Sequence, residues 1–212
     1  MIIIGVRPCR QHQVAVLTDD GREIMLDTRT WEESPYGVDS SLSEEELVQL
    51  CAKSDGDRAR DKAVFLLSRR DYSRKELAQK LCRERGRYCA ERQESAEQAA
   101  AYMEELGYVN DEAYAARLAR QYQLEKLYPR RRAVEKLCEK GIPRGIAQQA
   151  VEDVNAEDAQ LALEFLRKKR YTIPQSAEEA DKQAAAMARY GFSYDDIRRA
   201  FAARKEEVDY GD

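Results

Sequence analysis

The spacing of apolar positions changes along the chain and divides it into two parts. Up to about residue 31, apolar and polar residues alternate, as in the run from Val14 to Val16 and the run from Ile24 to Leu26, which is typical of half-buried β-strands. The turn between these runs contains Asp20-Gly21, a strong hairpin signal because both residue types tolerate a positive φ. We therefore expect a small β-hairpin, or a three-stranded sheet, at the N-terminus.

Residues 33–42 are rich in turn-forming residues and are expected to link this head to a short helix. Ser43 followed by Glu46 has the pattern of a capping box, in which each side chain bonds to the backbone N–H of the other residue at the start of a helix. The helix is expected to end before residues 54–57, where a glycine lies between two aspartates. The head would then comprise residues 1–57.

From Arg58 onward apolar residues recur every three or four positions, which predicts amphipathic helices. Breaks in this pattern divide the remainder into three units of three helices each. The predicted fold is therefore mainly α, with three tandem three-helix repeats in an elongated array behind a small β-hairpin head. The predicted domains are an acidic head at 1–57, repeats at 58–110, 111–156 and 157–205, and an acidic tail at 206–212.

Stretches of the helical part repeat one another at fixed offsets. Residues 66–73 reappear 99 positions later as residues 165–172, with apolar, basic, aromatic and hydroxyl classes mostly in the same order. Lys80-Leu81-Cys82 recurs 56 positions on, and Gly141-Ile142-Pro143 matches Gly191-Phe192-Ser193, 50 positions on. Different pairs of copies share different parts of a unit, which indicates a tandem array of small supersecondary units. Such an array presents a long surface and not a deep pocket.

Short-range signals mark several helix ends. Ser73, with Glu76 three residues later, is expected to cap the second helix of the first repeat. The first helix of the second repeat is expected to run from Asp111 to Tyr128, and the last helix of the third from Ser193 to Arg204. Glycine adopts the left-handed conformation of a helix end at little cost, and this role is predicted for Gly86, Gly141 and Gly191. Gly107 is expected to close the third helix of the first repeat.

The net charge of −4 conceals a difference between the two parts of the chain. Residues 1–57 hold 5 Lys/Arg and 12 Asp/Glu, a net charge of −7. Residues 58–212 hold 31 and 28, a net charge of +3. The helical repeats are thus mildly basic although the whole chain is acidic.

Cysteine usage and hydropathy indicate the compartment. The five cysteines form no Cys-x-x-Cys pair, and an odd number at wide spacing argues against a disulfide framework or a zinc site. The apolar run Ile2–Ile4 is far shorter than that of a signal peptide, and no window approaches the ~20 apolar residues that a membrane span needs. These features predict a cytoplasmic protein with reduced thiols and no membrane contact.

Catalytic motifs are largely missing, so we expect a protein that is not an enzyme and that holds no cofactor or metal. The single histidine, His12, lies in the presumed head, where a surface or turn role is favoured over catalysis. The sequence contains no phosphate-binding Gly-rich loop, metalloprotease motif or nucleophile elbow. The carboxylate pairs Asp19-Asp20 and Asp195-Asp196 are better explained by a hairpin turn and by the first turn of a helix, where acidic residues are favoured.

Basic residues gather at or near the junction of the first and second helices in every repeat. Such groups along an extended surface suit a phosphate backbone or an acidic protein face, while helix capping and a solvated charged surface are the alternatives. Tyr72, Tyr128 and Tyr171 recur beside them, and packing against the core of each repeat is favoured over base stacking. The candidate partner- or DNA-binding residues are Arg69, Arg70, Arg74, Lys75, Arg130, Arg131, Arg132, Lys168, Lys169 and Arg170.

Motifs in a fixed order carry a resemblance to a known family. Residues 73–81 (SRKELAQKL), then residues 106–115 (LGYVNDEAYA) and finally residues 190–197 (YGFSYDDI) resemble the RecX family, regulators of the bacterial recombinase RecA. The resemblance covers about residues 58–204. The combination of these motifs in this order is more specific than any one of them alone. It implies three tandem three-helix repeats without catalytic activity.

By this resemblance the protein is expected to bind the RecA filament on single-stranded DNA. It would lie in the helical groove of the filament and restrain strand exchange, ATP hydrolysis and coprotease activity, in DNA repair, recombination and the SOS response. A monomer with a direct but weak DNA contact is expected, and Asn110 or Asp111 would cap the first helix of the second repeat. The residues expected to shape the repeats and their joints are Gly107, Tyr108, Asn110, Asp111, Gly141, Gly191 and Phe192.

Two other functions remain open from the residues alone. Three-helix units overlap in pattern with helix-turn-helix domains, so a helical protein that binds DNA on its own is one alternative. The overall acidity weakens it, because non-specific DNA binders usually carry a basic domain. A helical scaffold that binds another protein is the second alternative, and it predicts no effect on recombinase activity.

Overall fold

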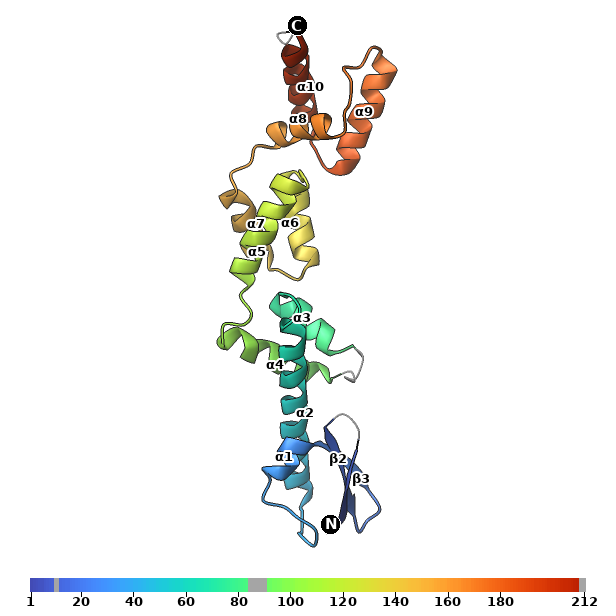
Figure 1. Ribbon diagram of the computed structural model, residues 1–212, viewed down its shortest axis with the longest axis vertical. Coiled ribbons are helices and arrows are strands. Elements are labelled where there is room, and N and C mark those ends of the chain that lie inside the picture. The colour runs from blue at the N-terminus through green and yellow to red at the C-terminus, as the bar shows by residue number, and fades with distance from the viewer. Residues whose placement is uncertain (10–11, 84–90, 210–212) are drawn as a thin grey trace. The chain divides into compact units, whose positions relative to one another are not determined.

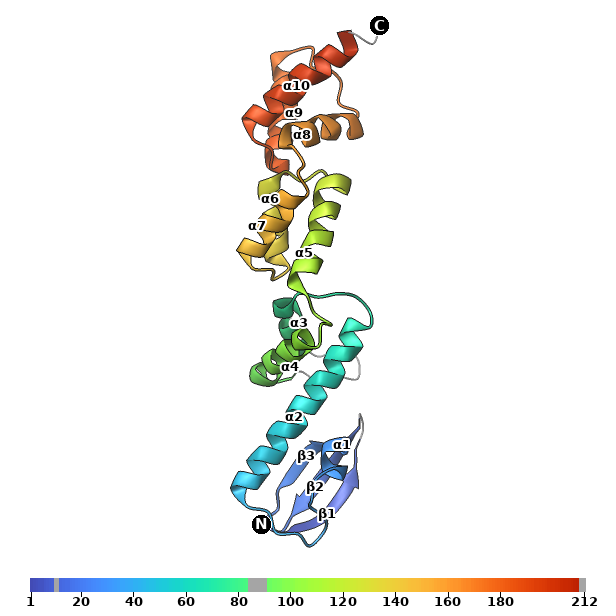
Figure 2. The ribbon, with the colours of Figure 1, turned by 90° about the vertical axis from the view of Figure 1, so that its left-hand side faces the viewer.

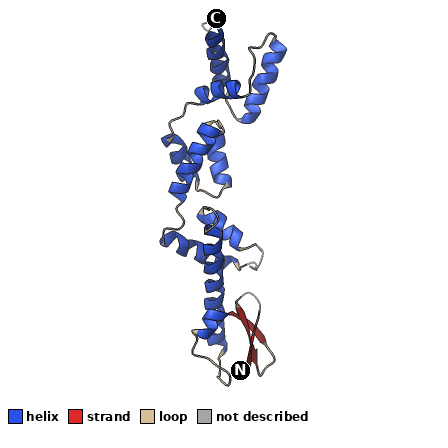
Figure 3. Ribbon diagram, viewed as in Figure 1, coloured by secondary structure: helices blue, strands red, loops and turns tan. Residues whose placement is uncertain are grey.

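The computed structural model describes residues 1–9, 12–83 and 91–209 (Figure 1). The chain divides into two compact units, Met1–Asn110 and Asp111–Asp212. In the described part of the chain, the strands belong to the N-terminal head, and the remaining regular structure is helical (Figure 3). The predicted mainly α fold with a small N-terminal β head is confirmed.

The head is an antiparallel sheet in the order β1-β2-β3, with strands at Ile3–Pro8, Gln13–Thr18 and Glu23–Asp27. β2 and β3 form the predicted hairpin, in which Gly21 has a φ of +83°. β1 extends it to a three-stranded sheet, and α1 (Thr28–Glu32) follows β3 directly. The sheet packs on the next helix through one buried cluster: Ile3, Val14, Val16, Leu26 and Leu50.

A single long helix, α2 (Glu44–Leu67), follows the head. The predicted capping box is confirmed, because Ser43 accepts a hydrogen bond from the N–H of Glu46 and the Glu46 carboxylate accepts one from the N–H of Ser43. The predicted helix end at residues 54–57 is wrong, since α2 runs through these residues to Leu67, with a total length of 24 residues. The head and the first repeat share this helix (Figure 2), and the predicted boundary between residues 57 and 58 falls inside it.

The polar residues that suggested a helix end instead anchor α2 to the head. The Oγ of Ser54 accepts a hydrogen bond from the N–H of Asp27 at 2.7 Å, and the hydroxyl of Thr30 donates to the carboxylate of Asp57 at 2.8 Å. Ser54 and Asp57 are buried, and these bonds satisfy polar groups that otherwise favour caps and turns. Contacts with the head therefore offset the cost of about 1 kcal/mol that Gly56 adds inside a helix.

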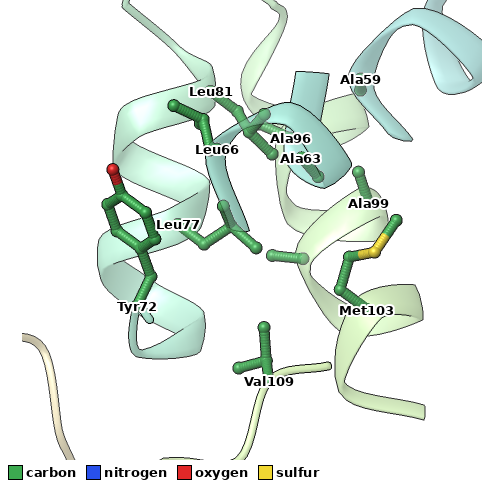
Figure 4. Close-up of a cluster of buried hydrophobic side chains, with 11 residues drawn as sticks. Ala59, Ala63, Leu66, Tyr72, Leu77, Leu81, Ala96, Ala99, Met103 and Val109 are labelled. Atoms are coloured by element: carbon green, nitrogen blue, oxygen red, sulfur yellow. The ribbon is translucent and has the colours of Figure 1, made fainter. Parts of the chain in front are cut away.

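The first repeat consists of the C-terminal part of α2 with α3 (Arg74–Leu81) and α4 (Gln93–Glu105). Ser73 caps α3 as predicted, accepting a hydrogen bond from the N–H of Glu76 at 3.1 Å. The predicted helix end at Gly86 lies outside the described residues. α4 packs against both α2 and α3 around a core (Figure 4) of Ala59, Ala63, Leu66, Tyr72, Leu77, Leu81, Ala96, Ala99, Ala100, Met103 and Val109.

The second repeat contains α5 (Asp111–Arg120), α6 (Arg130–Glu139) and α7 (Arg144–Asp153). As in the first repeat, the third helix packs against the two before it. The prediction that its first helix runs to Tyr128 is wrong at the C-terminal end. α5 passes into a π-helical turn, η1 (Gln121–Glu125), and the chain has left the helix before α6 begins.

The third repeat contains α8 (Asp158–Lys168), α9 (Ala177–Tyr190) and α10 (Tyr194–Asp209), and α10 packs mainly against α8. Its core is the most aromatic of the three repeats, because the ring of Phe165 contacts those of Tyr190 and Phe192 with centroids 4.5 and 5.7 Å apart.

The last helix is longer than predicted. It continues past Arg204 to Asp209, and the predicted boundary between residues 205 and 206 falls inside it. Glu207 in the added turn forms ion pairs with Arg204, at 2.9 Å, and with Arg167 of α8. These pairs hold an extra helical turn, so the predicted acidic tail is helical up to Asp209. Residues 210–212 lie outside the described residues.

Candidate partner-binding surface

Two arginines of the first basic cluster pair with carboxylates of their own repeat. The guanidinium of Arg70 lies 3.7 Å from the centre of the Tyr72 ring and forms an ion pair with Glu76 at 2.8 Å. Arg74 forms an ion pair with Glu104 of α4 at 3.0 Å. Both arginines are exposed, and exposed pairs of this kind contribute little stability. Their charge is therefore partly balanced but still accessible.

Arg69 and Lys75 complete the first cluster and are exposed. The guanidinium of Arg69 lies 4.7 Å from the centre of the Phe65 ring, a cation–π contact at the protein surface. These two side chains present positive charge to the solvent on either side of the start of α3.

The second cluster divides between the surface and a contact with the third repeat. Arg131 is 86% exposed and forms an i,i+4 ion pair with Glu135 at 3.1 Å. Arg130 reaches the start of the third repeat, because its backbone N–H donates to Asp158 of α8 at 2.9 Å and its Nε donates to the carbonyl of Ala156, just before α8, at 3.2 Å. Of these two neighbours, only Arg131 points its charge away from the protein.

Arg132, the third member of that cluster, is half-buried between repeats. Its guanidinium carbon lies 4.4 Å from the ring centre of Tyr128 and 4.3 Å from that of Tyr190, and its Nη1 donates to the carbonyl of Tyr190. Burial and the neighbouring Tyr128 raise the pKa of the Tyr190 phenol, although Arg132 acts in the opposite direction.

The third cluster lies at the C-terminal end of α8. The Nζ of Lys168 donates to the carbonyl of Glu125 in η1 at 2.7 Å, across the boundary between repeats. Lys169 lies 5.9 Å from the centre of the Phe165 ring. Arg170 takes the left-handed conformation, with a φ of +55°, just after α8, in the position where α4, α6 and α9 are followed by glycine. Lys169 and Arg170 are exposed.

Arg130 and Arg132 of the second predicted cluster and Lys168 of the third thus belong to one contact region between repeats, which we call the repeat 2–3 joint. Sequence analysis did not single out Tyr190 as a member, and no local pattern identifies it because its hydrogen-bond partners in repeat 2 are 58 and 64 positions away in the chain. The joint comprises Glu125, Lys126, Tyr128, Pro129, Arg130, Arg132, Ala156, Asp158, Lys168, Tyr190 and Gly191.

The predicted structural glycines end helices as expected. Gly107, Gly141 and Gly191 have φ values of +77°, +85° and +115°, and in each case the next residue donates its N–H back into the last helical turn, as in a Schellman motif. Phe192 is buried after Gly191, whereas Tyr108 after Gly107 is 66% exposed. The first repeat therefore presents an aromatic side chain where the third buries one.

Asn110 and Asp111 stand at the start of α5. Asn110 immediately precedes the helix and Asp111 is its first residue. Asparagine is favoured just before a helix, and a carboxylate in the first turn interacts favourably with the helix dipole. The capping role of these residues stays a prediction.

The three recurrent tyrosines pack against the cores of their own repeats. Tyr72 is fully buried in the first repeat, and Tyr128 and Tyr171 are partly buried against the second and third. The expectation that they serve packing is confirmed.

The described residues contain no group of three or more His, Cys, Asp or Glu side chains placed to hold a metal ion. His12 is exposed, with a φ of +58°. Asp19-Asp20 belongs to the hairpin turn and Asp195-Asp196 to the first turn of α10. Among the helices that the structure describes, none has the length and apolar content to cross a membrane.

Comparison with known proteins identifies the family. The model of the first three-helix domain of RecX matches residues 59–85, and that of the third matches residues 156–201. The chain is 30% identical over 162 residues to the regulatory protein RecX of Halorhodospira halophila, covering 76% of this chain and 96% of the relative. The chain belongs to the RecX family. It is also 33% identical over 149 residues to RecX of Vibrio cholerae, covering 70% and 94% of the two chains.

Solved RecX structures share the fold. A crystal structure of regulatory protein RecX covers 93% of this chain and 97% of its own, with a TM-score of 0.64 and 17% identity. RecX from Lactobacillus salivarius covers 71% and 97%, with a TM-score of 0.59 and 21% identity. The first RecX domain model begins inside α2, after the β head.

Proposed function

We propose that the protein regulates the recombinase RecA by binding the RecA filament on single-stranded DNA. It would mainly inhibit the recombinase, ATPase and coprotease activities of that filament. The observation that carries the proposal is membership of the RecX family, whose matched relatives are named regulatory proteins and align over nearly their whole length. The protein would act by contact and not by catalysis.

Exposed cations offer a direct means of contact. Arg69 and Lys75 in the first repeat, Arg131 in the second, and Lys169 and Arg170 in the third carry their charge at the surface. Positive groups of this kind attract an acidic protein face or a phosphate backbone. They are therefore the first residues to test for filament binding, ahead of the cations that lie in the repeat 2–3 joint.

Repetition favours binding to a filament. A filament presents the same protomer again and again, and this chain presents a basic group in each repeat. Once one repeat is bound, the next contact forms at a high effective concentration. We therefore expect inhibition with fewer than one copy of the protein per RecA protomer.

The primary test is ATP hydrolysis by a bacterial RecA on single-stranded DNA, with the protein titrated well below one copy per protomer. Binding to naked DNA is measured in parallel. We expect inhibition together with weak DNA binding. Tight, salt-sensitive DNA binding without inhibition would contradict the proposal and favour a stand-alone DNA-binding protein, for which six neutralised phosphates give a log-log salt slope near about −5. No effect in either assay would favour a scaffold for another protein.

Charge-removal variants locate the contact. The double variant Arg131→Ala/Lys169→Ala removes an exposed cation from each of two repeats. Its matched control, Lys182→Ala/Lys205→Ala, removes two exposed cations from α9 and α10. We expect a severalfold rise in the concentration for half-inhibition in the first variant alone, with the helical circular dichroism signal unchanged in both. Equal behaviour of the two variants would exclude Arg131 and Lys169 from the contact.

A further inference from the structure

Repeat 3 completes the end of a helix that belongs to repeat 2. The last carbonyl groups of a helix have no partner within it; η1 ends at Glu125, and Lys126 is its C-cap. The Nζ of Lys168 donates to the Glu125 carbonyl at 2.7 Å, and the hydroxyl of Tyr190 donates to the Lys126 carbonyl. Donors from α8 and α9 thus satisfy the end of η1.

Arg132 lies at the centre of this joint. Its guanidinium faces the rings of both Tyr128 and Tyr190, whose centres are 5.4 Å apart with their planes tilted by 60°. It also donates to the carbonyl of Tyr190 at the end of α9. A planar guanidinium can stack on aromatic rings and donate in its own plane at the same time, which a lysine ammonium cannot do. One side chain of repeat 2 therefore contacts both a ring and a helix end of repeat 3.

Gly191, which has no side-chain carbon, lies where the end of α9 packs against the start of α6. A Cβ at Gly191 would lie 3.2 Å from the Cβ of Arg132 and 3.3 Å from the Cγ of Pro129. The φ of +115° at Gly191 is in addition unfavourable for other residues. Glycine at this position therefore permits both the helix end and the close approach of α6.

We propose that the repeat 2–3 joint holds these two repeats in one fixed arrangement, that the RecA filament binds that arrangement, and that Arg132 is a positioning residue and not a cation contacting the filament. The inference rests on the proposed function. Its physical basis is that a preorganised pair of repeats avoids the ordering cost that a flexible pair pays on binding. Loss of the joint then weakens binding without the loss of any contact with the filament.

Four full-length variants distinguish a role of Arg132 in holding the joint from a role of its charge in contacting the filament. Arg132→Ala removes the joint contact together with the charge, Arg132→Lys keeps the charge, and Gly191→Ala keeps every charge but adds a methyl group where the joint closes. Arg131→Ala is the matched control, because it removes an exposed cation from the same helix. Each variant is first checked by circular dichroism and thermal unfolding, so that only folded proteins are compared.

We expect the three joint variants to need about tenfold more protein for half-inhibition of RecA ATP hydrolysis, because the two repeats must then be ordered relative to one another on binding. Their dependence on salt should equal that of the wild type, because no contact with phosphate or acidic groups is lost. Arg131→Ala should instead reduce the salt slope. Amide hydrogen exchange at Arg130, whose N–H donates to Asp158, should be faster in the joint variants only.

The proposal is overturned if Arg132→Lys or Gly191→Ala speeds exchange at Arg130 and yet inhibits RecA like the wild type. It is also overturned if exchange at Arg130 stays slow in all three joint variants, since these residues would then not hold the joint. If the wild-type protein does not inhibit RecA, the proposed function fails. Hydrogen exchange still reports separately on whether Arg132 and Gly191 hold the two repeats together.

Discussion

In repeats 1 and 2, a lysine donates hydrogen bonds to carbonyl groups at the end of a helix. In repeat 1 the lysine belongs to the same repeat, whereas in repeat 2 it belongs to repeat 3. In repeat 1, Lys62 of α2 is fully buried and donates to the carbonyls of Leu81 and Arg83, at 2.7 and 2.8 Å, where α3 ends. In repeat 2, the exposed Lys168 reaches from α8 to the carbonyl of Glu125 at 2.7 Å. The first lysine closes a repeat on itself, and the second closes a repeat on its neighbour.

Three-helix units of the same design are thus not equivalent in this chain. Repeat 1 satisfies the end of α3 from within and shares α2 with the head, through the contacts of Ser54 and Asp57. Repeat 2 is completed by side chains of repeat 3. We therefore expect repeats 2 and 3 to unfold together, and the following changes test how far this difference extends.

The largest effect is expected for the buried lysine. Lys62→Met keeps much of the side-chain volume but removes both donated hydrogen bonds, so the free energy of unfolding should fall by about 2 kcal/mol. Lys168→Met is the matched change at the exposed lysine, and it should cost roughly 0.5 kcal/mol or less because water can replace the donor. Urea unfolding measures both. Equal losses in the two variants would show that burial does not distinguish the two lysines.

An intermediate effect is expected at the repeat 2–3 joint. Tyr190→Phe removes the hydroxyl that donates to the Lys126 carbonyl and should lower the free energy of unfolding by about 1 kcal/mol. Tyr194→Phe removes the same group from a side chain that is 74% exposed and should change it by less than about 0.5 kcal/mol. Thermal unfolding of both variants measures the difference. A Tyr190→Phe protein as stable as Tyr194→Phe would argue against a joint held by this bond.

The smallest effect concerns pH. Burial raises the pKa of the Asp158 carboxyl from its ordinary value near 3.8, the N–H of Arg130 opposes this, and Asp196 adds to it. Because the folded protein binds this proton more tightly than the unfolded chain does, the free energy of unfolding falls as pH rises from the ordinary pKa through the raised one.

Asp158→Asn should lack this decrease, while its amide oxygen can still accept the hydrogen bond from Arg130. We expect the variant to be more stable than the wild type at pH 7, by less than about 1 kcal/mol for a partly exposed group, with the difference shrinking as the pH is lowered through the raised pKa of Asp158 toward 3.8. Urea unfolding between pH 3 and 7 measures it, with the exposed Asp181→Asn as the control for charge. A constant difference across this range would contradict the assignment.

Features that depend on near neighbours in the chain could be predicted. The capping box at Ser43, the cap at Ser73 and the left-handed glycines at 141 and 191 each involve groups within six positions of one another. The mainly α fold, the hairpin and the family could be predicted for the same reason. Helix periodicity, turn residues and motif order are all local properties.

Features that depend on distant partners could not be predicted. The helix end proposed at residues 54–57 is absent because Asp27 and Thr30, both 27 positions away from their partners, satisfy the polar side chains of α2. Likewise, the basic cluster at residues 130–132 was identified, but its division between surface and joint was not. The nearest ring and carbonyl of repeat 3 lie 58 positions from Arg132.

The sequence by itself determined the mainly α class, most helix starts and ends, and the family, because these follow from hydrogen bonds and apolar spacing within a few turns of chain. Only the tertiary structure decided that α2 joins the head to repeat 1, and that Arg132 and Lys168 act between repeats while Arg131 and Lys169 face the solvent. The sequence shows the same arginine or lysine whether its side chain is exposed to water or packed against a tyrosine. Which of these occurs depends on packing between segments that are far apart in the chain.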